Sequence, residues 1–145
     1  MSSDLHIRSY RASDETGVVE LWIACKLVVS HNDPRKDIRR KLGVNPEWLL
    51  IGEQESRIVA TCVVGYEGHR GWINYLAVSP DARRRGIATR MMAEAERSLR
   101  KAGCPKINLQ VRSTNLQVIE FYRSLGFKVD DVTSMGKRLE VDEPT

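Results

Sequence analysis

Three arginines and a glycine, Arg83-Arg84-Arg85-Gly86, stand where a β-rich stretch gives way to a long helical pattern. The first backbone N–H groups of a helix have no partner within it, and the helix dipole adds partial positive charge there. Gly86 and Ala88 let an anion approach the backbone closely, and guanidinium groups suit phosphate oxygens. These residue types at this spacing predict an anion-binding loop at the start of a helix.

Two common phosphate-binding motifs are absent from the chain. Neither G-x-G-x-x-G nor G-K-[ST] occurs, which argues against a dinucleotide-binding fingerprint or a P-loop. An isolated run of arginines is also compatible with a solvated basic loop. Net charge is +4 and aromatic residues make up only 6%, so a basic nucleic-acid-binding module is the weaker alternative.

A second group of residues with chemical potential lies further along the chain, around Tyr122. Asn115 is suited to cap a helix that continues through Leu125, with Gly126 closing it. Tyr122 falls inside this helix, and a phenol with an ordinary pKa of about 10 is a proton donor at neutral pH. Helix geometry alone favours a core aromatic next to Phe121.

The elements that must position these residues follow from hydrophobic periodicity. Strands are expected over residues 5–8, 48–53, 58–66, 72–78 and 107–111, with one or two more after Phe127. Helices are expected after Ser13 and over residues 34–42, 88–102 and 116–125. The order predicts one mixed α/β domain over residues 1–145, with a tail that frays after about residue 141.

Composition bounds the class of protein. The chain has 145 residues, 41% hydrophobic and 29% charged, which is typical of a soluble globular domain. Cys25, Cys62 and Cys104 form no C-x-x-C pair and no zinc pattern with the histidines, so we expect reduced thiols and no metal. The chain shows neither a signal-peptide core nor a membrane-spanning run, which predicts a cytoplasmic protein without a membrane partner.

The two groups of residues together resemble the GNAT (GCN5-related N-acetyltransferase) superfamily. Arg83-x-x-Gly86-x-Ala88 is similar to the R/Q-x-x-G-x-G/A signature of that family, with a strand pattern before it and a helix pattern after it. The stretch from Asn115 to Phe127 resembles the second family motif, N…(F/L)Y…LGF. Further segments, including Asn32-Asp33-Pro34 and Gly136-Lys137-Arg138-Leu139, resemble the bacterial YpeA subfamily.

This resemblance implies a fold and a cosubstrate. The GNAT fold is α+β, with a mixed, mostly antiparallel sheet of about six to seven strands flanked by about four helices. Acetyl-CoA is the implied cosubstrate. Its pyrophosphate would lie on the loop formed by Arg83, Arg84, Arg85, Gly86, Ile87, Ala88 and Thr89. Its pantetheine arm would follow the backbone of Leu76, Ala77 and Val78, like an added strand.

The resemblance also implies a reaction and two residue roles. Asn115 would contact the pantetheine arm, and Tyr122 would protonate the departing CoA thiolate. A primary amine, on a small molecule or on an aminoacyl or peptide acceptor, would attack the thioester directly in a ternary complex. A CoA-binding sensor without catalysis is the alternative. The implied partners are acetyl-CoA and the amine, without nucleic acid, and open strand edges make a homodimer a candidate assembly.

The group that accepts the amine proton is less defined. A lysine-like amine has a pKa of about 10.4, so some group must take its proton at neutral pH. Ribosomal-protein N-terminal acetyltransferases use a Glu where this chain has Gln110, which speaks against that substrate. The remaining carboxylates are Glu67, with a solvated turn residue as the alternative, and Asp33, with a helix N-cap as the alternative. Both, with Asn32, are expected to line the acceptor pocket.

Overall fold

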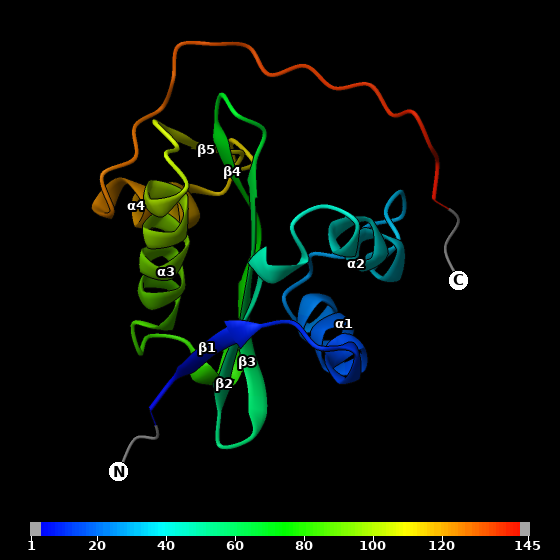
Figure 1. Ribbon diagram of the computed structural model, residues 1–145. Helices are drawn as coiled ribbons and strands as arrows, with labels where there is room; N and C mark the ends of the chain where they lie inside the picture. Colours follow the sequence, from blue (N-terminus) through cyan, green and yellow to red (C-terminus); the bar gives the residue numbers. More distant parts are fainter. Residues whose placement is uncertain (1–3, 143–145) are drawn as a thin grey trace.

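A central β-sheet with helices on both faces organises residues 4–142, the part of the chain that the computed structural model describes (Figure 1). In chain order, the elements are β1 (His6–Ser9), α1 (Glu15–Ala24), α2 (Pro34–Leu42), β2 (Leu49–Gln54), β3 (Arg57–Tyr66), β4 (Gly71–Val78), α3 (Ile87–Lys101), β5 (Ile107–Leu109) and α4 (Leu116–Ser124). Short 3-10 turns precede α1, β2 and α3. The α+β class expected from the sequence is confirmed.

The sheet follows the order β1-β2-β3-β4-β5. The first four strands pair in antiparallel fashion. Short polar turns connect β2 to β3 and β3 to β4, whereas α1 and α2 lie between β1 and β2. A helix, α3, connects β4 to β5, and these two strands pair in parallel, as a crossover connection requires. The sheet is therefore mixed and has five strands among the described residues, where six to seven were expected.

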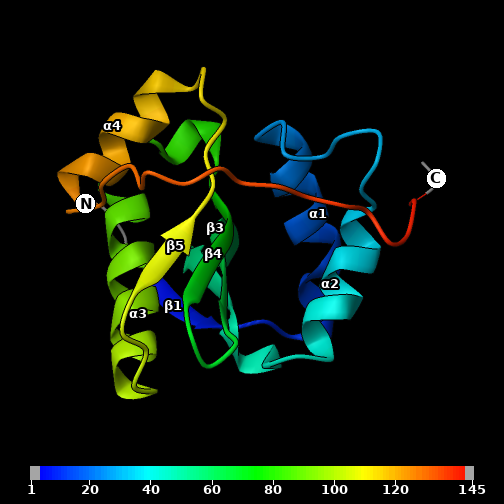
Figure 2. The ribbon, with the colours of Figure 1, turned by 90° about the horizontal axis from the view of Figure 1, so that it is seen from above.

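Two apolar clusters hold the helices to the two sheet faces (Figure 2). On one face, Met91, Ala95 and Leu99 of α3 repeat at helical spacing and are almost completely buried. On the other face, Trp22 of α1 and Ile38 of α2 are equally buried. Burial of such side chains stabilises the fold by about 1.5–3 kcal/mol each, which fixes both layers against the sheet.

The starts of α2 and α4 expected from the sequence are confirmed. Asp33 caps α2, with its carboxylate accepting hydrogen bonds from the backbone N–H groups of Arg35 and Lys36, and Pro34 is the first helical residue. The Asn115 side chain caps α4 by accepting from the N–H of Val118. These caps fix where the loops before α2 and α4 end and the helices begin.

The segment after Phe127 differs from expectation, since no strand forms there up to residue 142. Residues 128–141 run across the molecule from α4 toward α2 (Figures 1 and 2). Side chains rather than a backbone ladder attach the segment to β5, because Lys106 and Asn108 donate to the Asp130 carboxylate at 2.8 and 2.9 Å. Residues with a high strand propensity form a strand only where their backbone can pair with the edge of another strand.

Asp142, the first residue of the tail that is expected to fray, has several polar contacts. Its carboxylate is buried, accepts a hydrogen bond from the Asp33 backbone N–H at 2.9 Å, and forms a two-pronged ion pair with Arg40 at 2.7 and 3.1 Å. These contacts hold the pKa of the Asp142 carboxyl well below its usual range, with Arg40 contributing most. Residues 143–145, the rest of the expected tail, lie outside the described residues.

Candidate functional site

The loop between β4 and α3 has the form expected of an anion site. Gly86 adopts a left-handed backbone conformation (φ +74°), which suits glycine, and α3 begins at the next residue. The first hydrogen bond inside the helix runs from Arg90 N–H to Gly86 C=O, at 3.1 Å. The N–H groups of residues 87–89 therefore precede the helical ladder, and no acidic residue lies in this first turn.

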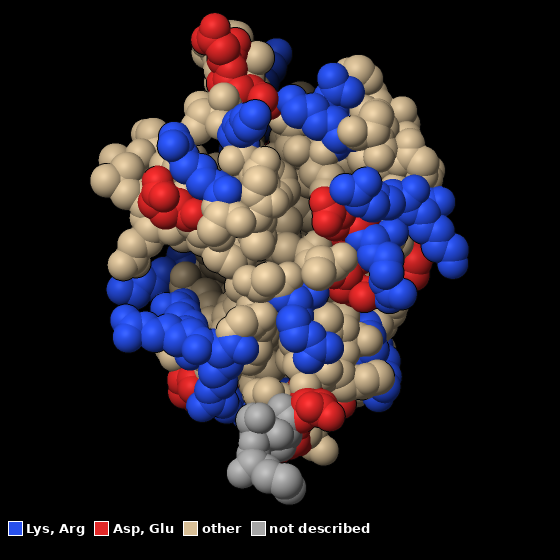
Figure 3. All heavy atoms as spheres, turned by 90° about the vertical axis from the view of Figure 1, so that its left-hand side faces the viewer, with Lys and Arg blue, Asp and Glu red and all other residues tan. Residues whose placement is uncertain are grey.

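The three arginines of this loop are all exposed, but they differ in their contacts. Arg83 folds back and donates to the Val78 C=O at 3.2 Å, which ties the loop to the end of β4. Arg84 and Arg85 form no hydrogen bond or ion pair with residues 4–142, so both guanidinium groups can reach a ligand. Basic side chains gather on the lower part of the α3 side of the molecule (Figure 3).

β4 supplies an open strand edge beside this loop. β4 and β5 pair only over Gly71, Trp72 and Ile73, so the rest of β4, including residues 76–78, has no strand partner on that side among the described residues. An extended ligand with amide groups can add to such an edge as a further strand. The residues predicted from the sequence to bind the cofactor, 76–78 and 83–89, thus lie on the part of β4 without a β5 partner and on the loop that leads from β4 into α3.

A β-bulge interrupts β4 at its midpoint. Val63 pairs with Asn74 and Thr61 pairs with Ala77, so two residues of β4, Tyr75 and Leu76, oppose one residue of β3. Tyr75 has a positive φ (+49°), which is a strained conformation for an aromatic residue. Strained backbone conformations of this kind are concentrated at functional sites in proteins. The bulge sends Tyr75 into the cluster beneath α1 and α2, whereas Leu76 packs on the α3 face.

Tyr122 lies on the α3 face, near the bulge. Its ring is 8% exposed and makes edge-to-face contacts with Phe121 and Phe127, at centroid distances of 5.1 and 5.5 Å. The hydroxyl has no hydrogen-bond partner among residues 4–142. Burial raises the pKa of Tyr122, with a smaller contribution from Cys62, the residue of β3 opposite the bulge. Tyr122 is therefore a protonated and unengaged donor at neutral pH.

The remaining predicted cofactor residue, Asn115, lies at the exposed start of α4. Its side-chain oxygen is used by the helix cap, at 3.3 Å from Val118 N. The amide nitrogen of Asn115 has no partner within the described part of the chain. Asn115 can thus cap α4 and still donate one hydrogen bond to a ligand.

The two carboxylates predicted as candidate bases both accept hydrogen bonds from backbone N–H groups. Asp33 is buried and its carboxylate accepts two N–H groups at the start of α2, at 2.9 and 3.4 Å. Glu67 is exposed in the β3–β4 turn and accepts from the N–H groups of His69 and Arg70. This turn precedes β4, roughly 23 Å of strand from Val78.

A polar network that sequence reasoning missed lies on the face of β4 that packs against α1 and α2. The Tyr75 hydroxyl donates to the Asp37 carboxylate at 2.5 Å and accepts from the Asn32 amide at 2.7 Å. The Tyr75 ring is stacked on Trp22, with centroids 3.8 Å apart. Burial, followed by the hydrogen bond to Asp37, raises the pKa of Tyr75, so it remains a donor.

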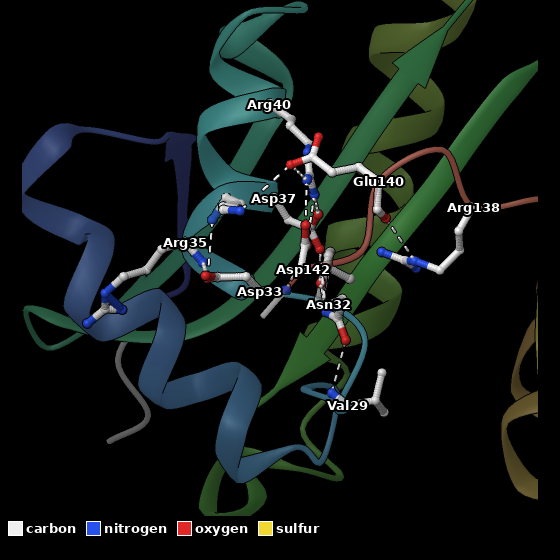
Figure 4. A network of polar contacts seen from close by, with 11 residues as sticks. Val29, Asn32, Asp33, Arg35, Asp37, Arg40, Arg138, Glu140 and Asp142 are labelled. Atoms are coloured by element: carbon white, nitrogen blue, oxygen red, sulfur yellow. Dashed lines mark hydrogen bonds and ion pairs between the residues drawn. The ribbon is translucent and has the colours of Figure 1, made fainter. Parts of the chain in front are cut away.

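The same network reaches the C-terminal segment through α2 (Figure 4). Arg40 donates to Asp37 at 2.9 Å and also holds Asp142. Asn32 accepts from the Val29 N–H at 3.0 Å, which orders the loop before α2. Tyr75 reaches Asp37 because of its positive φ and the bulge, and no residue pattern in the sequence predicts either feature. Asp37 has the pattern of an ordinary acidic residue in the first turn of α2.

A cleft with a volume of about 1200 Å³ lies elsewhere, beside β5 and α4 and under residues 125–134. Tyr122 lines it, but the loop 83–89 does not. Residues 4–142 contain no group of three or more His, Cys, Asp or Glu side chains placed to hold a metal ion. None of their helices is both long enough and apolar enough to cross a membrane.

Comparison with known sequences gives a consistent family. Residues 15–127 match the Acetyltransferase (GNAT) family. An acetyltransferase of Yersinia enterocolitica is 42% identical over 139 residues, covering 96% of this chain and 99% of that protein. An acetyltransferase of Pectobacterium atrosepticum is 43% identical over 138 residues, covering 95% of this chain and 98% of that protein.

Solved structures share the fold at low sequence identity. The aminoglycoside N-acetyltransferase AAC(6′)-Iy, in complex with a CoA bisubstrate analogue, has a TM-score of 0.76 at 19% identity, covering 94% of this chain and 99% of that chain. The ribosomal-protein-S18-alanine N-acetyltransferase of Escherichia coli has a TM-score of 0.72 at 20% identity, with coverages of 86% and 78%.

Proposed function

The chain belongs to the GNAT family of acetyltransferases, and on that premise we propose that it transfers the acetyl group of acetyl-CoA to a primary amine by direct attack in a ternary complex. The observation that carries this proposal is the continuity of an open β4 edge with the row of N–H groups that precedes the ladder of α3. The open β4 edge can pair with the pantetheine amides, and the N–H groups at the start of α3 can bind the pyrophosphate. Its resemblance to the YpeA subfamily stays a prediction.

The cosubstrate would lie along residues 76–78 and 83–89. Guanidinium groups of Arg84 and Arg85, which have no partner within residues 4–142, would neutralise phosphate oxygens. The amide nitrogen of Asn115 would donate to the pantetheine arm from the opposite wall. With the pantetheine arm on the β4 edge, the thioester would reach the level of the bulge, close to Tyr122.

Tyr122 would act as the general acid. When the tetrahedral intermediate collapses, the C–S bond breaks and the sulfur leaves as a thiolate that needs a proton. The Tyr122 hydroxyl is free to donate it, because no residue of the described chain competes for that proton and burial keeps the phenol protonated. A positioned general acid contributes about 10²–10⁴-fold to a rate.

The acceptor would approach from the side of α1 and α2, where the bulge presents Tyr75. Asn32 and Asp37 hold the Tyr75 hydroxyl there, and the Asp37 side chain remains 26% exposed. We assign Asp37, rather than Glu67 or Asp33, as the carboxylate that this wall offers to the amine. A charged partner suits a primary amine, which is protonated in water at neutral pH.

Two measurements test the proposal in sequence. Thermal unfolding with increasing acetyl-CoA should show a rise in Tm, because a ligand that binds only the folded state stabilises it. CoA release should then be followed across lysine amides, peptide N-termini, polyamines and aminoglycosides, the last because AAC(6′)-Iy is named for them. Binding without turnover of any amine would favour a CoA-binding sensor, and absence of binding would reject both functions.

A further inference from the structure

Asp142 brings a buried carboxylate to the wall where the amine is proposed to bind. Its side chain is fully buried, accepts from the Asp33 N–H at 2.9 Å, and accepts from both terminal guanidinium nitrogens of Arg40, at 2.7 and 3.1 Å. These contacts join the C-terminal segment to α2 and to the loop before it (Figure 4). The desolvation cost of a buried charge can exceed what its ion pair returns, so stability alone does not account for Asp142.

Arg40 is divided unequally between two carboxylates. Its Nη2 donates to Asp142 Oδ1 at 2.7 Å, whereas its Nη1 donates both to Asp142 Oδ2 at 3.1 Å and to Asp37 Oδ1 at 2.9 Å. Asp142 therefore holds both prongs of the guanidinium group, and Asp37 receives one shared N–H. Glu140, which is 63% exposed, lies 3.3 Å from Nη2 and adds only a weak pair.

Asp37 keeps capacity for a further donor as a result. Its Oδ2 accepts from the Tyr75 hydroxyl at 2.5 Å and from the Asn32 amide at 3.4 Å, and its Oδ1 accepts from Arg40. An ionised carboxylate has about four lone-pair sites, so these three donors leave about one of them for a protonated amine. The Asp37 side chain is 26% exposed, which gives the amine access to it.

The contact between Asp37 and Arg40 would change without the charge of Asp142. The two residues are three positions apart on α2 and therefore share one face of the helix. Guanidinium and carboxylate groups favour two parallel hydrogen bonds. Once Nη2 is released from Asp142, it can turn to Asp37, complete a two-pronged pair and use the remaining acceptor site. The charge offered to the amine would then be neutralised within the protein.

We propose that Asp142 is a positioning residue for the amine acceptor, because it holds Arg40 in a place that leaves Asp37 available. The proposal rests on the proposed function, through the assignment of Asp37 to the acceptor wall. Asp142 does not touch the amine and acts only through Arg40. The end of the C-terminal segment thereby sets the affinity for the amine, although Asp142 and Arg40 are 102 positions apart in the sequence.

Asp142→Asn tests the proposal, because it keeps the shape of the side chain and removes its charge. A neutral amide competes poorly with the Asp37 carboxylate for a guanidinium group. The KM of the amine, measured by CoA release with an acceptor from the panel above, should rise about 3- to 5-fold, the effect of one partly exposed ion pair. The kcat and the KM of acetyl-CoA should stay within about 2-fold of the wild-type values.

The matched control is Glu140→Gln. It removes a charge from beside the same guanidinium group, but from an exposed pair, so the KM of the amine should change by less than about 2-fold. A change in this control as large as that in Asp142→Asn would overturn the proposal, because it would show a general response to charge around Arg40.

A second substitution separates positioning from stability. When Arg40→Gln is added to Asp142→Asn, no guanidinium group remains to cover Asp37, so the KM of the amine should return to the wild-type value or below it. A purely structural role predicts the opposite, because the second substitution removes further contacts. The proposal fails if the double variant is as impaired as Asp142→Asn. It also fails if Asp142→Asn has the wild-type KM for the amine, or equal losses for both substrates.

A crystal structure of Asp142→Asn gives a readout that needs no turnover. Both Nη atoms of Arg40 should lie about 2.7–2.9 Å from the two carboxylate oxygens of Asp37. An Arg40 that residue 142 still holds, with one bond to Asp37, would overturn the proposal whatever the amine. Absence of turnover with every amine would instead contradict the proposed function, so the two failures are distinguishable.

Discussion

Replacement of Tyr122 by Phe tests the proposed mechanism with the smallest change to the structure. The ring contacts with Phe121 and Phe127 remain, and the hydroxyl that is lost has no hydrogen-bond partner among residues 4–142. Stability should therefore change by less than about 0.5 kcal/mol, and acetyl-CoA affinity should be nearly unchanged. We expect kcat and kcat/KM to fall together by about 10-fold or more, equivalent to about 1.4 kcal/mol of transition-state stabilisation.

The assay is CoA release with an amine acceptor found in the panel described above, measured from pH 6 to pH 10. Because burial raises the pKa of Tyr122 above its ordinary value of 10.0, the wild-type rate should not fall through loss of this proton within that range. Tyr66→Phe is the matched control, since its hydroxyl bonds only turn carbonyls of Gly68 and Gly103. Full kcat in Tyr122→Phe, or an equal loss in the control, would refute the general-acid role.

Three further predictions address the cofactor loop, the acceptor wall and the stability of the fold. Gly86→Glu should raise the dissociation constant for CoA, measured by calorimetry, at least about 100-fold, because its carboxylate would repel the phosphates. Gly86→Ala should lower the free energy of unfolding by about 1–2 kcal/mol through backbone strain alone, and should bind CoA more tightly than the Glu variant. Asp37→Asn should raise the KM of the amine about 10-fold while the KM of acetyl-CoA stays constant; equal changes in both would contradict the acceptor-wall assignment. Asp14→Asn should lower the free energy of unfolding in urea by about 1.5–3 kcal/mol, because it breaks the pair with Arg8 at 2.7 and 2.9 Å while Arg8 keeps Glu53. Because Arg8 lowers the pKa of Asp14, the stability that this pair gives the wild type should be complete above about pH 4 and lost as pH falls through the folded-state pKa.

The sequence predicted the features that depend on neighbouring residues. Asp33 followed by Pro34, and Asn115 at the start of α4, marked helix starts through local hydrogen bonds, and the structure confirms both. The apolar repeat of Met91, Ala95 and Leu99 likewise identified the buried face of α3. Such signals are visible in one sequence because each depends on positions at most a few residues apart.

Features that depend on distant residues were not predictable in this way. Strands after Phe127 were expected from β-rich composition, yet that segment is attached through side chains such as Asp130 and has no backbone ladder. Asp142 was expected in a frayed tail, but Arg40, about a hundred positions earlier, binds it. Contacts of this kind are decided by which edges and charges the fold brings together, and one sequence does not report them.

The arrangement of β4 explains how one strand can serve two substrates. Its pairing with β5 ends at Ile73, which leaves an edge open for the cosubstrate on the side of α3 and α4. Directly after this point the bulge places Tyr75 on the opposite face, against Trp22 and Asp37. In a regular strand the residues alternate strictly between the two faces, so β4 without the bulge would lack the extra residue that places Tyr75 on this face. Under the proposed function, the thioester and the amine would therefore approach the bulge from opposite faces of the sheet. Tyr75, with its strained φ, would lie on the amine side and Tyr122 on the cosubstrate side.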